Sequence, residues 1–67
     1  MNETSDRVRQ IQPRMALRRS GGWLAATPPG AAICIGVVGP TESDARERFA
    51  EALEIWAKSF EEEKPII

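Results

Sequence analysis

The residue types that could do chemistry are few in this chain. Histidine is absent, and Cys34 is the only cysteine among the 67 residues. Catalytic pairs built on histidine, histidine metal sites and a disulfide framework are therefore excluded. Cys34 falls within an apolar run, where a thiol behaves as a small buried hydrophobe. We predict a protein that is not an enzyme, with no catalytic residue, no metal and no cofactor.

The remaining polar patterns also have structural explanations. Glu47, Glu51 and Glu54 fall on the polar face of a predicted helix, and a solvated charged face is the ordinary use of such a pattern. Gly21-Gly22 and Gly36-x-x-Gly39 lack the spacing and the strand-to-helix context of a phosphate-binding loop. We therefore interpret these glycines as residues that form turns or interrupt and end strands.

Charge is divided unevenly along the chain. Residues 1–40 carry five Arg against two acidic residues, and residues 41–67 carry four Lys or Arg against eight acidic residues. The two halves thus have net charges of +3 and −4, which sum to the overall −1. This division allows head-to-tail contact or contact with a polar partner surface, and it specifies neither.

Arginines surround the first predicted strand, and we take Arg14, Arg18 and Arg19 as the candidate contacts for a partner or a nucleic acid. Basic arms on small acidic proteins more often protect a strand edge or contact a protein than bind nucleic acid. A protein partner is therefore the first interpretation. Nucleic-acid binding along the Arg7–Arg19 edge is the alternative.

The strongest pattern in the chain is a helix over residues 41–60. Its apolar side chains recur at steps of four, four, three and four, which places them on one face: Ala45, Phe49, Leu53, Trp56 and Phe60. Thr41 followed by Asp44 predicts a helix N-cap with its capping-box partner.

Three extended segments precede the helix. Residues 14–19 and 23–27 flank the turn Ser20-Gly21-Gly22, which predicts a β-hairpin. Residues 31–38 follow a Pro-Pro-Gly break and are apolar on both faces. A strand of this kind is typical of a central position covered on both sides.

The expected architecture is α+β: a three-stranded antiparallel sheet with one C-terminal helix packed on one face, in the order β-β-β-α. We expect a flexible or irregular lead-in over residues 1–13, a single domain over 14–62 and a short tail over 63–67. The predicted core comprises the apolar residues that face inward: Met15, Leu17, Trp23, Ile33, Ile35, Val37, Phe49, Leu53, Trp56 and Phe60.

One helix covers one face of a sheet only. A domain of 67 residues buries only about 60% of the surface of its unfolded chain, so it is marginally stable on its own. We therefore expect a homodimer. The polar N-terminal decapeptide is unlike a signal peptide. The longest apolar stretch, residues 31–38, is shorter than the roughly 20 residues that a bilayer requires. These features predict a cytoplasmic protein with no membrane contact.

Two short runs carry a resemblance to a known family. GWLAATP over residues 22–28, followed by GPTESDA over residues 39–45, resembles the HicB-like antitoxins across about residues 14–60. The resemblance implies a partial RNase H-like β-β-β-α fold. It also implies binding and occlusion of a small toxin that cleaves mRNA. Pro40 replaces the polar residue that is usual there, and no DNA-binding domain follows the helix, so autoregulation is not implied.

The sequence thus favours a non-catalytic protein-interaction module that resembles a HicB-type antitoxin domain. The alternative is a nucleic-acid-binding or regulatory protein. A third reading is a structural subunit of a larger assembly.

Overall fold

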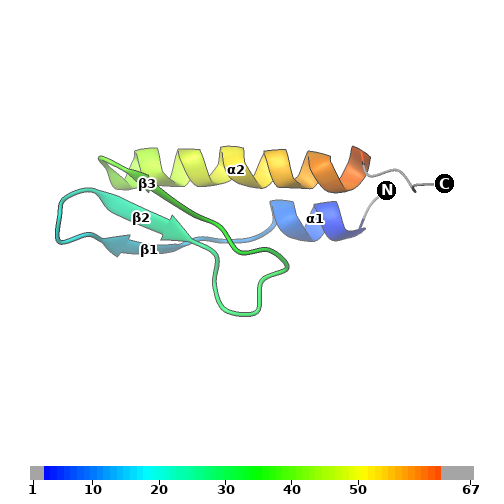
Figure 1. Ribbon diagram of the computed structural model, residues 1–67, viewed down its shortest axis with the longest axis horizontal. Helices are drawn as coiled ribbons and strands as arrows, with labels where there is room; N and C mark the ends of the chain where they lie inside the picture. The colour runs from blue at the N-terminus through cyan, green and yellow to red at the C-terminus, as the bar shows by residue number, and fades with distance from the viewer. Residues whose placement is uncertain (1–2, 63–67) are drawn as a thin grey trace.

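The computed structural model describes residues 3–62 and contains three antiparallel strands followed by a long helix. This arrangement confirms the predicted α+β class (Figure 1). A short N-terminal helix precedes the sheet. The elements are α1 (Glu3–Arg9), β1 (Arg14–Leu17), β2 (Trp23–Ala26), β3 (Gly36–Gly39) and α2 (Glu42–Glu62). The predicted tail over residues 63–67 lies outside the described residues.

The sheet has the order β1-β2-β3, with both neighbouring pairs antiparallel. Met15, Ala25 and Val37 lie opposite one another across the three strands and face the helix layer. The hairpin closes through a bond from Arg18 N to Gly22 O of 3.0 Å. Gly21 and Gly22 adopt positive φ angles, which glycine reaches without steric cost.

The third strand differs from its prediction in length and position. Only Gly36–Gly39 is extended within the ladder, and β3 is an edge strand, so a central, doubly covered position for it is wrong. Residues 31–35, which connect the Pro-Pro-Gly loop to β3, lie outside the sheet. Gly30, in that loop, adopts a positive φ. Thr27 anchors the end of this segment: its N–H donates to Ile35 O (3.0 Å), and its hydroxyl accepts from Ile35 N (3.2 Å).

Helix α2 begins after Thr41, whose Oγ1 accepts a bond of 3.1 Å from Asp44 N. The residues of α2 that are buried lie at steps of four: Ala45, Phe49, Leu53 and Ala57. The prediction of Trp56 in the core is wrong, because this row reaches Ala57 and leaves the Trp56 side chain 42% exposed. Its ring contacts Phe60, with 6.3 Å between centroids.

Apart from Trp56 and Leu17, the predicted core residues show two grades of burial. Phe49 and Leu53 are buried, and the partly buried residues that pack against them include Met15, Trp23, Ile33, Ile35, Val37 and Phe60. Leu17 was also expected in the core and is 69% exposed. It ends β1, and α2 packs mainly on β2 and β3, so the end of β1 lacks a cover.

The N-terminal segment is the largest departure from expectation. A flexible or irregular lead-in is wrong for Glu3–Arg9, which forms α1. A seven-residue helix is marginal in isolation, so its contacts with the rest of the chain decide whether it forms. Ser5 and Val8 are buried against α2, and acidic residues in the first turn with arginines in the last turn suit the helix dipole.

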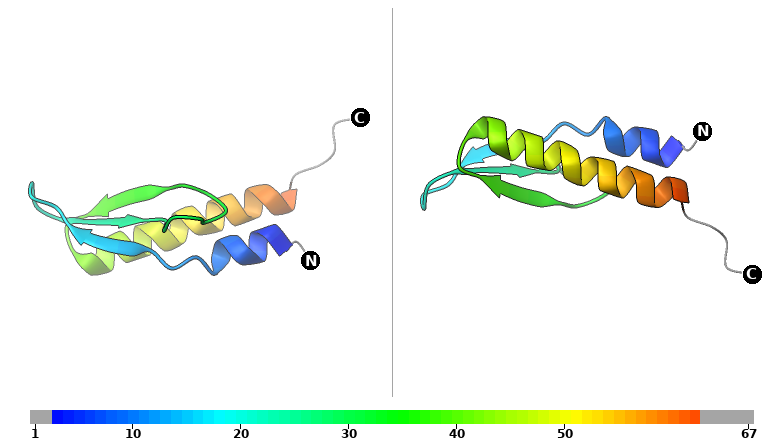
Figure 2. Two further views of the ribbon diagram at one scale, coloured as in Figure 1. Left: turned by 90° about the horizontal axis from the view of Figure 1, so that it is seen from below. Right: turned by 90° about the horizontal axis from the view of Figure 1, so that it is seen from above.

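Helix α2 runs along most of the length of the molecule, and the turn between β1 and β2 extends past its N-terminal end (Figure 1). The sheet packs on its N-terminal half, and α1 runs antiparallel beside its C-terminal half (Figure 2). The sheet therefore has one covered face, towards α2, and one outer face. No helix within residues 3–62 has the length and hydropathy needed to cross a membrane.

Gly39 sits where β3 meets the first turn of α2. A Cβ at this position would lie 2.7 Å from Ala45 N and 3.0 Å from the Asp44 backbone, and neither backbone atom can move independently. A Cβ at Gly36, on the same strand, would meet only Leu24 Cδ1 at 3.8 Å, an ordinary contact. Glycine is thus required at one end of β3 and tolerated at the other.

We predict that Gly39→Ala lowers the free energy of unfolding by about 1–3 kcal/mol, because strand and helix must separate to admit the methyl group. Gly36→Ala is the matched control. It should leave stability unchanged or raise it by up to about 1 kcal/mol through the unfolded state. Urea unfolding followed by circular dichroism measures both, and equal losses for the two variants would contradict the close contact at Gly39.

Candidate interaction surface

The outer face of the sheet carries small and apolar side chains. Ala16, Leu24 and Val38 lie opposite one another on the three strands, on the face away from α2. Val38 is 43% exposed and Leu24 is half-buried. Ala26 and Gly36 continue the surface towards the other end of the sheet. A contiguous apolar surface that nothing in residues 3–62 covers is typical of a binding site.

Arginines stand at both ends of this outer face. Arg14 borders a hollow beside the Pro28–Cys34 loop, and Arg18 borders a second hollow with Val38 and Arg48. Arg19 follows Arg18 in the hairpin turn and is exposed. No Asp or Glu occurs anywhere in residues 7–40, so no acidic side chain of the sheet offsets these charges. The outer face is therefore both apolar and basic.

The structure separates the five N-terminal arginines into two groups. Arg7 pairs with Glu3 in its own helix, and Arg9 is bound by α2. Within residues 3–62, Arg14, Arg18 and Arg19 form no side-chain ion pair. A continuous basic edge over Arg7–Arg19 is therefore not formed, and the three predicted contact residues are the arginines of this edge that remain available.

Arg9 joins α1 to α2 through four side-chain hydrogen bonds. Its Nε and Nη2 donate to the two oxygens of Glu54 (both 3.0 Å), and its Nη1 and Nη2 donate to Glu61 (2.8 and 2.9 Å). Ser5 Oγ donates to Glu61 Oε2 (3.1 Å). Single exposed ion pairs contribute little, but bidentate pairs that share one guanidinium hold it in a fixed geometry.

These contacts shift the pKa values of the three charged groups. The hydrogen bonds from Arg9 lower the pKa of Glu61 to about 2, with a smaller contribution from Ser5. They also lower the pKa of Glu54, and the two carboxylates together raise the pKa of Arg9. The cluster therefore stays charged well below neutral pH and serves to dock α1.

Little in the sequence indicates this cluster. Glu54 and Glu61 are seven residues apart, which places them on one side of α2 two turns from each other. Glu54 was interpreted as part of a solvated face, and it contacts Arg9 instead. The spacing was the only available signal, since Arg9 lies 45 residues away along the chain.

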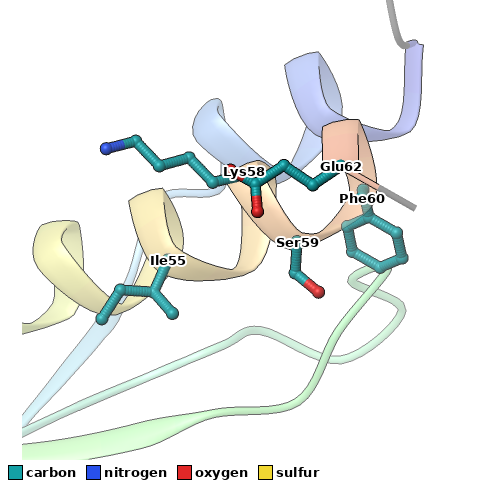
Figure 3. Close-up of a pocket in the computed structure, with 5 residues that line it drawn as sticks. All are labelled: Ile55, Lys58, Ser59, Phe60 and Glu62. Carbon is teal, nitrogen blue, oxygen red and sulfur yellow. The ribbon is translucent and has the colours of Figure 1, made fainter. Parts of the chain in front are cut away.

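A separate hollow lies on α2, lined by Ile55, Lys58, Ser59, Phe60 and Glu62 (Figure 3). Ile55 is 70% exposed, and Trp56 lies beside it in the sequence. Ile55 and Ser59 point to the same side of the helix, and Phe60 points towards the loop that precedes β3 (Figure 3). This second apolar surface was not predicted, because Ile55 lies off the expected core face.

The structure also places the groups considered for chemistry. Cys34 was expected to be buried within a strand, and it is exposed in the segment before β3. The prediction of a buried thiol is therefore wrong, because residues 31–35 leave the sheet with alternate side chains turned outward. Among residues 3–62, no group of three or more acidic or cysteine side chains has the arrangement to hold a metal ion.

Protonation of Glu61 should weaken the docking of α1. A carboxyl group whose folded pKa is depressed stabilises the fold above its ordinary value of 4.5, and this contribution is lost as the pH falls towards about 2. We predict that Glu61→Gln lowers the free energy of unfolding at neutral pH. As the pH falls from 4.5 towards about 2, the variant should lose less stability than the wild type does. Glu47→Gln, two turns before Glu54 on the same side of α2 but outside the ion pairs of Arg9, is the control. Thermal unfolding over the pH series measures this, and identical profiles for wild type and Glu61→Gln would contradict the role of the cluster.

Comparison of the chain with known protein families, curated proteins and solved structures finds no match. A functional conclusion therefore depends on the surfaces that the fold presents. Of these, the outer face of the sheet combines apolar area with arginines that form no ion pair inside the described part of the chain.

Proposed function

We propose that this chain is a non-catalytic protein-interaction module that binds and occludes a small protein partner through the outer face of its sheet. The observation that carries the proposal is the exposed apolar row Ala16, Leu24 and Val38, placed between Arg14 and Arg18. Burial of an apolar centre within a charged rim is the ordinary anatomy of a protein interface.

The charge of this face defines the chemistry of the partner. Residues 14–40 contain three arginines and no acidic residue. A complementary surface presents apolar side chains bordered by carboxylates, since charges of opposite sign favour encounter and fix orientation. The resemblance to HicB-type antitoxins agrees with this mode of action, in which the partner is a small toxin-like protein and inhibition is steric.

The alternative function, nucleic-acid binding, has specific support in the same three arginines. Fewer arginines are available for this function than the sequence suggests, because Arg7 and Arg9 are engaged by Glu3, Glu54 and Glu61. Binding of a phosphate backbone depends on the number of cations that it contacts, so the loss of two arginines weakens this mode. We also propose a cytoplasmic location, because the exposed thiol of Cys34 would remain free in a reducing compartment.

We predict that a small, stoichiometric protein is retained by the tagged chain in nuclease-treated extract of its own cells. Val38→Arg should abolish retention, because a guanidinium replaces the apolar centre of the face. Glu47→Lys, on the opposite side of the molecule, also adds positive charge and should leave retention intact.

Combined replacement of Arg14, Arg18 and Arg19 by Ala separates the two functions. Weakened retention of a protein that survives nuclease supports the proposal. Recovery of RNA or DNA by the wild type, lost at high salt and in the triple variant, would replace it with nucleic-acid binding. Equal retention of a protein by wild type and Val38→Arg would place the site elsewhere on the molecule.

A further inference from the structure

Helix α2 presents a second exposed row on a flank that α1 does not contact. Its members recur at steps of four, three, four and three: Arg48, Ala52, Ile55, Ser59 and Glu62. This spacing is that of the seam between two paired helices. Ala52 is half-buried and the other four residues are exposed. The row is distinct from the buried row that packs on the sheet and α1.

The hollow on α2 lies within this row. Phe60 lines it together with four residues at positions i, i+3, i+4 and i+7: Ile55, Lys58, Ser59 and Glu62 (Figure 3). Four helical residues at this spacing form the hole that receives a side chain from a neighbouring helix. The small side chain of Ser59 leaves the hole unfilled, and the exposed Ile55 supplies an apolar wall.

We propose that the occupant of this row is α2 of a second copy of the chain, packed antiparallel about Ile55. Reversal of the helix about this residue places Arg48 opposite Glu62 of the second copy. It places Ala52 of each copy at the hollow beside Ser59 of the other. The row is thus self-complementary: apolar at its centre, small on both sides, and oppositely charged at its two ends.

Two-fold symmetry forms each of these contacts twice, which favours a second copy over an unrelated helix. Arg48 has further donors for such a pair, because within residues 3–62 its side chain donates through Nη1 alone, to Val38 O at 2.7 Å. Trp56 borders the row and contributes exposed apolar area. A contact made by one helix face buries less than the roughly 800 Å² per partner of a standard interface, so the dimer is weak.

The inference concerns α2 and does not rest on the proposed function of the sheet. Sedimentation equilibrium from about 10 µM to about 1 mM should detect a monomer–dimer equilibrium of the wild type. Ile55→Ser should raise the dissociation constant by about tenfold or more, because two isoleucines lose their apolar contact. Glu47→Lys, elsewhere on α2, should leave it unchanged. Circular dichroism checks that each variant is folded.

Exchange of charges tests the antiparallel register. Arg48→Glu and Glu62→Lys should each weaken the dimer, since each variant places like charges opposite one another. Mixing the two variants should restore association, because a heterodimer regains both pairs of opposite charge. A wild type that is monomeric throughout the series would overturn the proposal. So would a dimer that Ile55→Ser does not affect, or one whose charge variants fail to recover on mixing.

Discussion

The packing of α2 against two different elements determines the rest of this structure. Its buried residues follow steps of four, and in a helix of 3.6 residues per turn such a row drifts around the axis. The row begins at Ala45 against Gly39 of the sheet and ends at Ala57, where α1 packs. Alanine at both ends permits close approach, and Phe49 fills the space between them.

This drift has a consequence for the surface of the molecule. Because the buried row turns towards α1, it leaves Ile55 and Trp56 outside, while the sheet keeps one face uncovered. The core is correspondingly small: of the six hydrophobic residues that are buried within residues 3–62, three are alanine. A domain of this size is marginally stable, and any partner that binds the folded state alone raises its stability. The exposed apolar surfaces are thus the ones through which association would stabilise the fold.

The sequence was sufficient for the features that depend on local patterns. Period-two and period-four hydrophobicity specified the hairpin and α2, and Thr41 marked the start of that helix. The sequence was insufficient for features that depend on contacts between residues far apart in the chain. Periodicity alone cannot choose between a step of three to Trp56 and a step of four to Ala57, since the choice depends on α1. Nor did residues 3–9 indicate that Arg9 would meet Glu54 and Glu61. The apolar character of β3 on both faces suits an edge strand as well as a central one when the outer face binds a partner.

The outer face of the sheet and the exposed row on α2 differ in charge, and this difference favours a different partner for each surface. Two copies joined by their outer sheet faces would bring Arg14, Arg18 and Arg19 of each against the same arginines of the other, with no acidic side chain in residues 14–40 to separate them. Like charges brought together in an interface are unfavourable, so this face is unsuited to self-association. The row on α2 carries both signs of charge, arranged so that reversal pairs opposites. Self-association through α2 therefore leaves the sheet free, and a dimer would present two basic, apolar faces to acidic partners at the same time.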